Sequence, residues 1–398
     1  MTYPHLVFLY ALTLMTLGLN QCPSTILKRS VKKFAVKFSV LIGSLLGLPL
    51  LGIVLAGLPV VRYLEFPPEK LYVHPAPFSW LFFTICALFI FAVLFPLIVA
   101  AIFNIRNFEV DYPTHFPFPW WGWLGLSTGA LFWILAWSRF SWFSKFQPHT
   151  FMPLWFSFIL IVNGLCYRQN GHCMMRDRTR FFLLLFPLSA GFWWFFEYLN
   201  RFVQNWHYLG IHHSPWEYFG YATLSFSTVL AAVLGTRDWF INVPWMKREF
   251  GEFVAVRCVH HRILAVFALM FSAVGLVGVG VWPNYLSPLL WLSPLLIIVA
   301  FQELQGENHV LSNIYYGDWR QVISSAMAAI FCGWFWEMWN YYSLAKWEYR
   351  VPFVHRFQIF EMPLLGYAGY LPFGLACSAV GEILEKMIYG KRTERFIS

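Results

Sequence analysis

The sequence contains few charged residues. Asp, Glu, Lys and Arg make up 12% of its 398 residues, whereas hydrophobic residues make up 59% and the mean hydropathy is +0.57. Several apolar runs are close to the ~20 residues that a helix needs to cross the hydrocarbon layer, and they are too long for helices of a soluble core. This composition excludes an ordinary soluble domain and predicts an all-α polytopic integral membrane protein.

The motifs of several enzyme classes are also missing. The sequence has no Gly-rich phosphate loop, Asp-rich diphosphate motif, zincin helix or serine nucleophile elbow, which argues against prenyl transfer and intramembrane proteolysis. Its seven cysteines are odd in number and lack paired metal-ligand spacing, so they predict neither a disulfide framework nor a zinc site. Most histidines fall in predicted loops, which does not favour a bis-histidine haem. We therefore expect no metal ion and no cofactor.

Eleven segments are candidate transmembrane helices, although the first is short enough to be an interfacial helix instead. Most of the 28 Lys and Arg residues fall on the side of a predicted basic loop at 21–37 and of the C-terminus. Because Lys and Arg collect in cytoplasmic loops, we expect a cytoplasmic C-terminus in a bacterial or archaeal cell membrane. Topology thus accounts for the formal charge of +9, and no nucleic-acid partner is expected. The predicted spans are 6–19, 38–61, 79–103, 119–137, 151–167, 181–200, 216–234, 262–282, 286–303, 321–341 and 360–384.

An internal duplication organises the second half of the chain. The stretch Trp193-Trp194-Phe195-Phe196-Glu197, with Asn200 three residues on, recurs as Trp334-Phe335-Trp336-Glu337, with Asn340 three residues on. Because an even number of crossings separates equivalent positions, we expect a parallel repeat of a three-helix unit. The predicted domains are an N-terminal membrane region of about four helices (1–149), repeat unit 1 (150–234), a connecting loop and helix (235–285), and repeat unit 2 with a cytoplasmic tail (286–398).

Four glutamates occupy matching places in the two units. Glu197 and Glu337 lie near the ends of outward helices, and Glu217 and Glu361 are expected to open the returning helices, so all four should gather toward the non-cytoplasmic side. Asn200 and Asn340 share a helix face with the acids that precede them. A simpler interpretation is that Glu217 and Glu361 are N-terminal helix acids and that the other two border the headgroups. The recurrence of the arrangement favours a functional role.

Aromatic residues surround these acids. A carboxyl group that loses its hydration is favoured in the neutral form and can then donate a proton, and tryptophan faces can stabilise a cation. Protonation of an isolated double bond needs both a proton donor and a surface that stabilises the resulting cation. Many of the 21 tryptophans must instead form an interfacial belt. The predicted substrate-binding residues are Trp193, Trp194, Trp216, Trp334, Trp336, Trp339 and Tyr367.

The order of these features resembles the repeated domain of the heterodimeric-type lycopene cyclases of archaea, fungi and some bacteria. An aromatic-rich helix with an acid is followed by Trp347 and Tyr349, then by Glu361, then by Pro372. That family has a proline before two adjacent acids, whereas here Glu361 stands alone and a proline follows it. The resemblance covers about 150–390, and it implies tandem three-span units and an isoprenoid or carotenoid-like substrate.

Two functions from different classes follow. The first is an integral membrane enzyme, cyclase- or hydratase-like, that protonates an alkene of a long isoprenoid. Its catalytic candidates are Glu337 and Glu361, with Glu197 and Glu217 in the same pocket and Asn200 and Asn340 beside them. The second is a non-enzymatic protein, either a proton-coupled transporter or a structural subunit of a larger membrane complex. Expected partners are membrane lipid or isoprenoid, with a membrane-protein partner or a second copy of the chain as further candidates.

Overall fold

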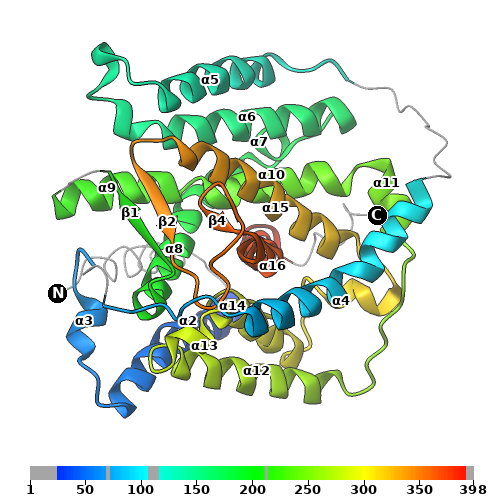
Figure 1. Cartoon of the computed structure of the whole chain (residues 1–398). Coiled ribbons are helices and arrows are strands. Elements are labelled where there is room, and N and C mark those ends of the chain that lie inside the picture. Colours follow the sequence, from blue (N-terminus) through cyan, green and yellow to red (C-terminus); the bar gives the residue numbers. More distant parts are fainter. Residues whose placement is uncertain (1–24, 69–71, 106–115, 211–213, 391–398) are drawn as a thin grey trace.

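The computed structural model describes residues 25–68, 72–105, 116–210 and 214–390, and most of them are helical (Figure 1). The first predicted span, 6–19, lies outside these residues. The longer helices are α2 (Thr25–Leu55), α4 (Trp80–Ile105), α5 (Trp120–Trp137), α6 (Phe151–Asn170), α8 (Thr179–Val203), α9 (Pro215–Phe226), α10 (Val229–Ile241), α12 (His261–Gly278), α14 (Leu289–Leu304), α15 (Arg320–Tyr341) and α16 (Tyr370–Tyr389).

Short elements join these helices. They are α3 (Val60–Leu64), α7 (Met174–Asp177), α11 (Pro244–Phe250) and α13 (Pro283–Leu286), with 3-10 turns at Ser141–Phe143, Gln147–His149, Ser312–Tyr316 and Leu364–Gly369. The predicted basic loop at 21–37 is wrong from Thr25 onward, because α2 already begins there. Lysine and leucine are good helix formers, so the basic segment can continue the apolar helix that follows it.

Seven helices of the described chain are long and apolar enough to cross a membrane. Two shorter apolar helices, Ser39–Leu55 and Leu289–Leu304, coincide with further predicted spans, and α5 forms where another was predicted without belonging to the seven. These lengths and compositions indicate a membrane protein. The seven are Trp80–Val99, Gln147–Asn170, Thr179–Val203, Pro215–Ile241, His261–Gly278, Arg320–Tyr341 and Leu364–Tyr389.

Burial separates peripheral helices from central ones. None of the apolar stretch of α4 is buried inside the protein, so its side chains need a solvent as apolar as lipid. Helix α10 is the opposite case, because Val229 to Thr236 are buried without interruption. A helix that is apolar and buried on all sides belongs to the centre of a structure.

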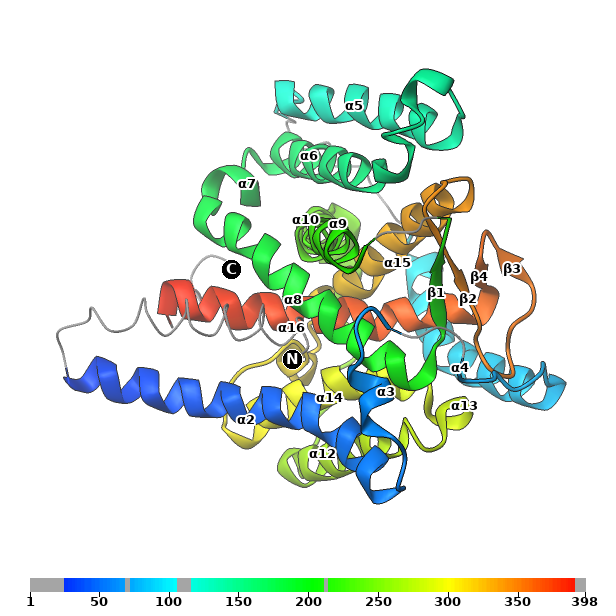
Figure 2. The same cartoon turned by 90° about the vertical axis from the view of Figure 1, so that its left-hand side faces the viewer.

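The helices pack in a continuous succession in which α16 is central. Helix α6 packs between α5 and α10, α15 packs between α10 and α16, and α14 lies between α16 and α12. Figure 1 views α16 along its axis and α10 from the side, whereas Figure 2 shows α16 from the side and α10 along its axis. The helices therefore do not form a bundle of parallel spans, and α16 crosses beneath α10 and α15.

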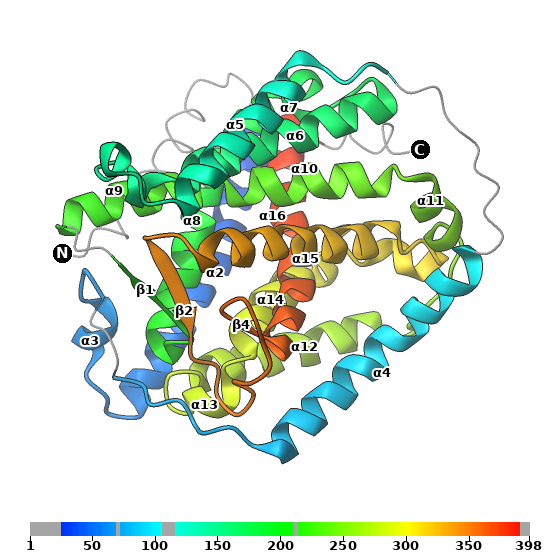
Figure 3. The same cartoon turned by 45° about the horizontal axis from the view of Figure 1, so that its top comes forward.

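The described chain also contains four short strands. Strand β1 (Trp206–Leu209) pairs antiparallel with β2 (Lys346–Tyr349), so that Trp206 lies opposite Tyr349 and Tyr208 opposite Trp347. Strands β3 (Gln358–Ile359) and β4 (Met362–Pro363) form a small hairpin. Figure 3 shows the β1–β2 ribbon crossing between the ends of α8 and α15. The ribbon thus links two segments that lie far apart in the sequence.

Replacing Gly374 by alanine should destabilise the protein. A Cβ atom there would lie 2.1 Å from the main-chain oxygen of Ser325, so α15 and α16 would have to separate. Overpacking of this kind costs about 1–3 kcal/mol, which thermal unfolding of purified Gly374→Ala would show as a lower midpoint. Gly191→Ala is the matched control, because a Cβ there meets nothing within 4 Å. Equal unfolding midpoints for the two variants would contradict this close packing.

Candidate functional site

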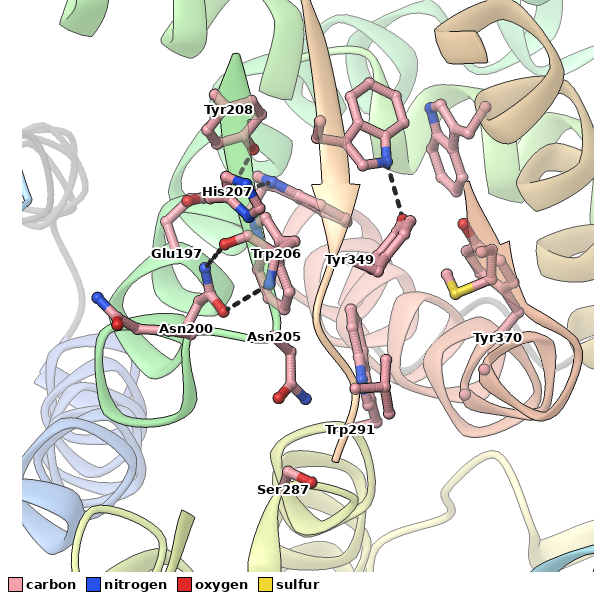
Figure 4. A pocket seen from close by; sticks show the side chains of 18 of the residues that line it. Glu197, Asn200, Asn205, Trp206, His207, Tyr208, Ser287, Trp291, Tyr349 and Tyr370 are labelled. Carbon is pink, nitrogen blue, oxygen red and sulfur yellow. Dashed lines mark hydrogen bonds between the residues drawn. The ribbon is translucent and has the colours of Figure 1, made fainter. Parts of the chain in front are cut away.

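A cavity of about 1080 Å³ lies beside the β1–β2 ribbon. Its walls come mainly from α4, α8, α9, β1, β2, the start of α14, and the turn that leads into α16. Most of the side chains around it are aromatic or aliphatic, and Figure 4 shows several of its polar residues among aromatic rings. This volume is at the upper end of the range for pockets that bind drug-sized molecules, so the cavity has room for a large apolar ligand.

Among the residues that the structure describes, Glu197 is the acid that lines this cavity. It is only 8% exposed, and its Oε1 accepts three hydrogen bonds: from Trp193 Nε1 (3.0 Å), Trp206 Nε1 (3.0 Å) and the Tyr208 hydroxyl (2.5 Å). Its Oε2 accepts no hydrogen bond from any residue that the structure describes. The carboxyl group is therefore held firmly through one oxygen, and the other bonds to no described residue.

Asn200 fixes the strand that supplies two of these donors. Its Nδ2 donates to the main-chain oxygen of Trp206 (2.8 Å), and the Trp206 main-chain N–H donates to its Oδ1 (3.4 Å). Figure 4 shows both bonds. Because Asn200 lies one helical turn beyond Glu197, it turns the chain back so that Trp206 and Tyr208 reach the acid.

Glu337 has a similar environment but is sealed from the cavity. It is fully buried, and its Oε1 accepts hydrogen bonds from the hydroxyls of Tyr349 and Tyr370, both at 2.7 Å. Its Oε2 is buried and has no hydrogen-bond partner among the described residues. Both tyrosines line the cavity, whereas Glu337 itself does not. Glu337 thus lies behind the cavity wall and holds two hydroxyl groups of that wall.

The second asparagine repeats the role of the first. Asn340 Nδ2 donates to the main-chain oxygen of Trp347 (2.7 Å), and the Trp347 N–H donates to Asn340 Oδ1 (2.8 Å). Among the described hydrogen bonds, none joins Asn340 to Glu337 or Glu361. Its side chain instead anchors β2, as Asn200 anchors β1.

The two acids differ in the residue that lies four positions before each of them. Trp193 lies four residues before Glu197, and the position four residues before Glu337 is Gly333. The ring of Tyr370 fills the space beside Gly333, where a Cβ atom would lie 2.5 Å from a ring carbon. Each acid therefore receives an aromatic donor at this place, from its own helix in one case and from α16 in the other.

The tyrosines of the ribbon remain protonated donors. Burial and the neighbouring carboxyl group raise the pKa of Tyr208 and of Tyr349 well above the usual value for a phenol. Their O–H groups are therefore present at any physiological pH and point at Glu197 and Glu337.

The other two predicted acids have different environments. The prediction that Glu361 opens a helix is wrong, since it lies in the turn between β3 and β4 and accepts a hydrogen bond from Lys346 Nζ (2.7 Å). Glu217 does begin a helix: its Oε2 accepts from the Ser214 N–H (2.9 Å) in a capping box at the start of α9. The structure thus gives Glu217 the simpler role of a helix N-terminal acid.

Only some of the predicted substrate-binding aromatic residues line the cavity. Trp193 and Trp336 line the cavity, whereas Trp216 and Trp334 are 62% and 45% exposed on the outside. Trp194, Trp339 and Tyr367 are not cavity residues: Trp194 donates to Thr223, Trp339 packs on Trp155, and the Tyr367 hydroxyl donates to the main-chain oxygen of Ile359.

Sequence reasoning missed many residues of the cavity, including three that contact Glu197 or Glu337. Trp206, Tyr208 and Tyr370 were not among the predicted site residues, although all three line it. A signal for the first two is present, because Trp206-x-Tyr208 follows Glu197 much as Trp347-x-Tyr349 follows Glu337. No comparable pattern indicates Tyr370.

The described residues hold no group of three or more His, Cys, Asp or Glu side chains placed to bind a metal ion. Outside the cavity, Glu303 contacts His261 Nδ1 (2.5 Å) and His309 Nε2 (2.8 Å). Comparisons with family models, with curated proteins and with solved structures gave no match for this chain.

Asn340→Leu should destabilise the ribbon. The substitution removes both bonds to Trp347 and leaves a main-chain N–H and C=O without partners, which costs about 1–3 kcal/mol for each buried group. Thermal unfolding should therefore occur at a clearly lower temperature than in the parent protein. Asn242→Leu is the control, since the Asn242 side chain makes one bond, to the Asp238 main chain. A loss no larger for Asn340 than for Asn242 would show that Asn340 does not anchor β2.

Proposed function

We propose that this protein is an integral membrane enzyme that protonates a carbon–carbon double bond of a long apolar isoprenoid or carotenoid-like substrate. The observation that carries the proposal is Glu197, a buried carboxyl group on the wall of an aromatic cavity of about 1080 Å³, with one oxygen that bonds to no described residue. The sequence favoured Glu337 and Glu361 as the catalytic acids, whereas we now propose Glu197 as the proton donor.

The proposed step needs no co-reactant. Neutral Glu197 donates the proton on Oε2 to one alkene carbon, and the π electrons form the new C–H bond and leave a carbocation. The cation then loses a different proton to the carboxylate, directly or after ring closure, so that the product is an isomer of the substrate and Glu197 is neutral again. The three hydrogen bonds to Oε1 stabilise the carboxylate between these events.

The wall around Glu197 suits a cationic intermediate. Trp193, Trp206, Trp291 and Trp336 all line the cavity, and indole faces attract a cation without supplying a nucleophile. Their rings contact one another, with centroids 5.6 Å apart for Trp206 and Trp291 and 6.2 Å apart for Trp193 and Trp336. In this proposal Glu337 is a positioning residue, because it holds the hydroxyls of Tyr349 and Tyr370 at the wall.

We also propose the finer architecture. The chain would have about eleven transmembrane helices, with the unit at 150–234 repeated at about 286–384 and a cytoplasmic C-terminus. The two Glu-x-x-Asn motifs, each tied to a returning Trp-x-Tyr strand, support the duplication, as does the antiparallel pairing of these strands. A cleavable tag at the C-terminus should resist protease added to intact cells and be cut in inverted vesicles. The opposite result would reverse the orientation.

Glu197→Gln should abolish catalysis. Glutamine keeps the shape and can still accept the three hydrogen bonds, but it has no acidic proton, and general acid catalysis contributes ~10²–10⁴-fold. The full-length protein in liposomes would be incubated in D₂O with lycopene, squalene or geranylgeraniol, and deuterium in the recovered isoprenoid measured by mass spectrometry. The parent protein should label at least one of them, and Glu197→Gln should slow the labelling by that factor.

Glu217→Gln is the matched control for this experiment, since glutamine also completes a capping box and Glu217 is not a cavity residue. It should label as the parent protein does. Undiminished labelling by Glu197→Gln, or no labelling by the parent protein, would contradict the enzyme. Proton uptake into the vesicles in place of labelling would favour the proton-coupled transporter.

A further inference from the structure

One end of the cavity contains two polar side chains that have no partners in the described part of the chain. The Asn205 side-chain oxygen is buried and accepts no hydrogen bond, and the residue as a whole is 6% exposed. Ser287, at the turn before α14, is 4% exposed, and its hydroxyl bonds to no described residue. Both residues line the cavity.

The two side chains approach from different elements. Asn205 lies between the end of α8 and β1, and its main-chain oxygen accepts the Arg350 N–H (2.7 Å), which fixes its backbone to the end of β2. Figure 4 shows its carboxamide pointing away from Glu197 and toward the helical turn that carries Ser287, beside Trp291. The side chain therefore stays in place although nothing in the described protein uses its hydrogen-bonding groups.

Leaving such groups unpaired is costly. A buried polar atom without a partner costs roughly 1–3 kcal/mol, and an apolar residue of the same size would avoid this cost. Asn200 and Asn340, in contrast, use both atoms of their carboxamides on strand main chains. This cost applies to the buried Asn205 oxygen, and it is explained if a ligand supplies the missing partner. The Ser287 hydroxyl lines the same cavity and has no hydrogen-bond partner among the described residues.

We propose that Asn205 and Ser287 form a subsite for a hydroxyl group, so that the substrate is a long isoprenoid alcohol rather than a pure hydrocarbon. This inference rests on the proposed function and deepens it. The Asn205 oxygen needs a donor, its amide and the Ser287 hydroxyl can donate, and a hydroxyl group is a donor and an acceptor at once. Anchoring this end of the substrate fixes which double bond lies against Glu197.

The subsite predicts a binding preference that can be measured without turnover. Three probes would be titrated into the full-length protein in detergent: geranylgeraniol, its methyl ether, and the hydrocarbon in which hydrogen replaces the hydroxyl. Quenching of tryptophan fluorescence reports binding, since Trp193, Trp206 and Trp291 line the cavity. The alcohol should bind roughly tenfold or more tightly than the hydrocarbon, and the ether, which cannot donate, should bind less tightly than the alcohol.

Asn205→Leu should remove most of this preference while the hydrocarbon still binds. Ser287→Ala should reduce the preference in the same direction, and it provides the test if Asn205→Leu fails to fold. Asn242→Leu, the same change outside the cavity, should leave the preference intact. Equal binding of alcohol and hydrocarbon by the parent protein, or an unchanged preference in both cavity variants, would overturn the subsite.

The outcome is separable from that of the proposed function. Deuterium labelling that depends on Glu197, together with equal binding of the three probes, would overturn the hydroxyl subsite and leave the enzyme. Failure of all three probes to bind would overturn the subsite and also remove the support that the cavity gives to the proposed function.

Discussion

A carboxyl group buried among aromatic rings is tolerated only if hydrogen-bond donors reach it. In this protein the donors cannot come from the helix that carries the acid alone, since helix main-chain N–H groups are already paired. Three of the five donors come from strands that turn back from the helix ends, and Trp193 on α8 and Tyr370 on α16 supply the other two. An asparagine one turn beyond each acid holds its strand by the main chain. The asparagines, the strands and the returning aromatic residues all follow from the need to satisfy Glu197 and Glu337.

This requirement also explains why the two strands pair. A single returning strand would leave its main-chain groups without partners in an apolar setting. Strands β1 and β2 pair their main-chain groups with each other. Their register places Trp206 opposite Tyr349 and Tyr208 opposite Trp347. The ribbon therefore joins the two acids into one structure and at the same time forms a wall of the cavity.

The sequence could predict the parts of this arrangement that depend on local pattern. Apolar length located most helices to within a few residues, and the repeated Glu-x-x-Asn spacing identified two acids that are indeed buried. Glu361 was misplaced because its environment is not local: Lys346, its partner, comes from β2, fifteen residues earlier in the chain. Tyr370 could not be anticipated either, because its role depends on the space left at Gly333 on another helix.

The three acids near the ribbon differ in how their charge is compensated, and this difference selects one of them. Glu361 forms an ion pair with Lys346 and is not a residue of the cavity wall. Glu337 receives two phenol donors but lies behind the cavity wall, so that an apolar substrate cannot reach it. No cation of the described chain forms an ion pair with Glu197, and the nearby Arg201 instead binds the main-chain oxygens of Tyr63 and Glu65. Glu197 alone combines access to the cavity, a free oxygen and uncharged hydrogen-bond donors. These are the conditions under which a carboxyl group can keep a proton until an alkene lies against it.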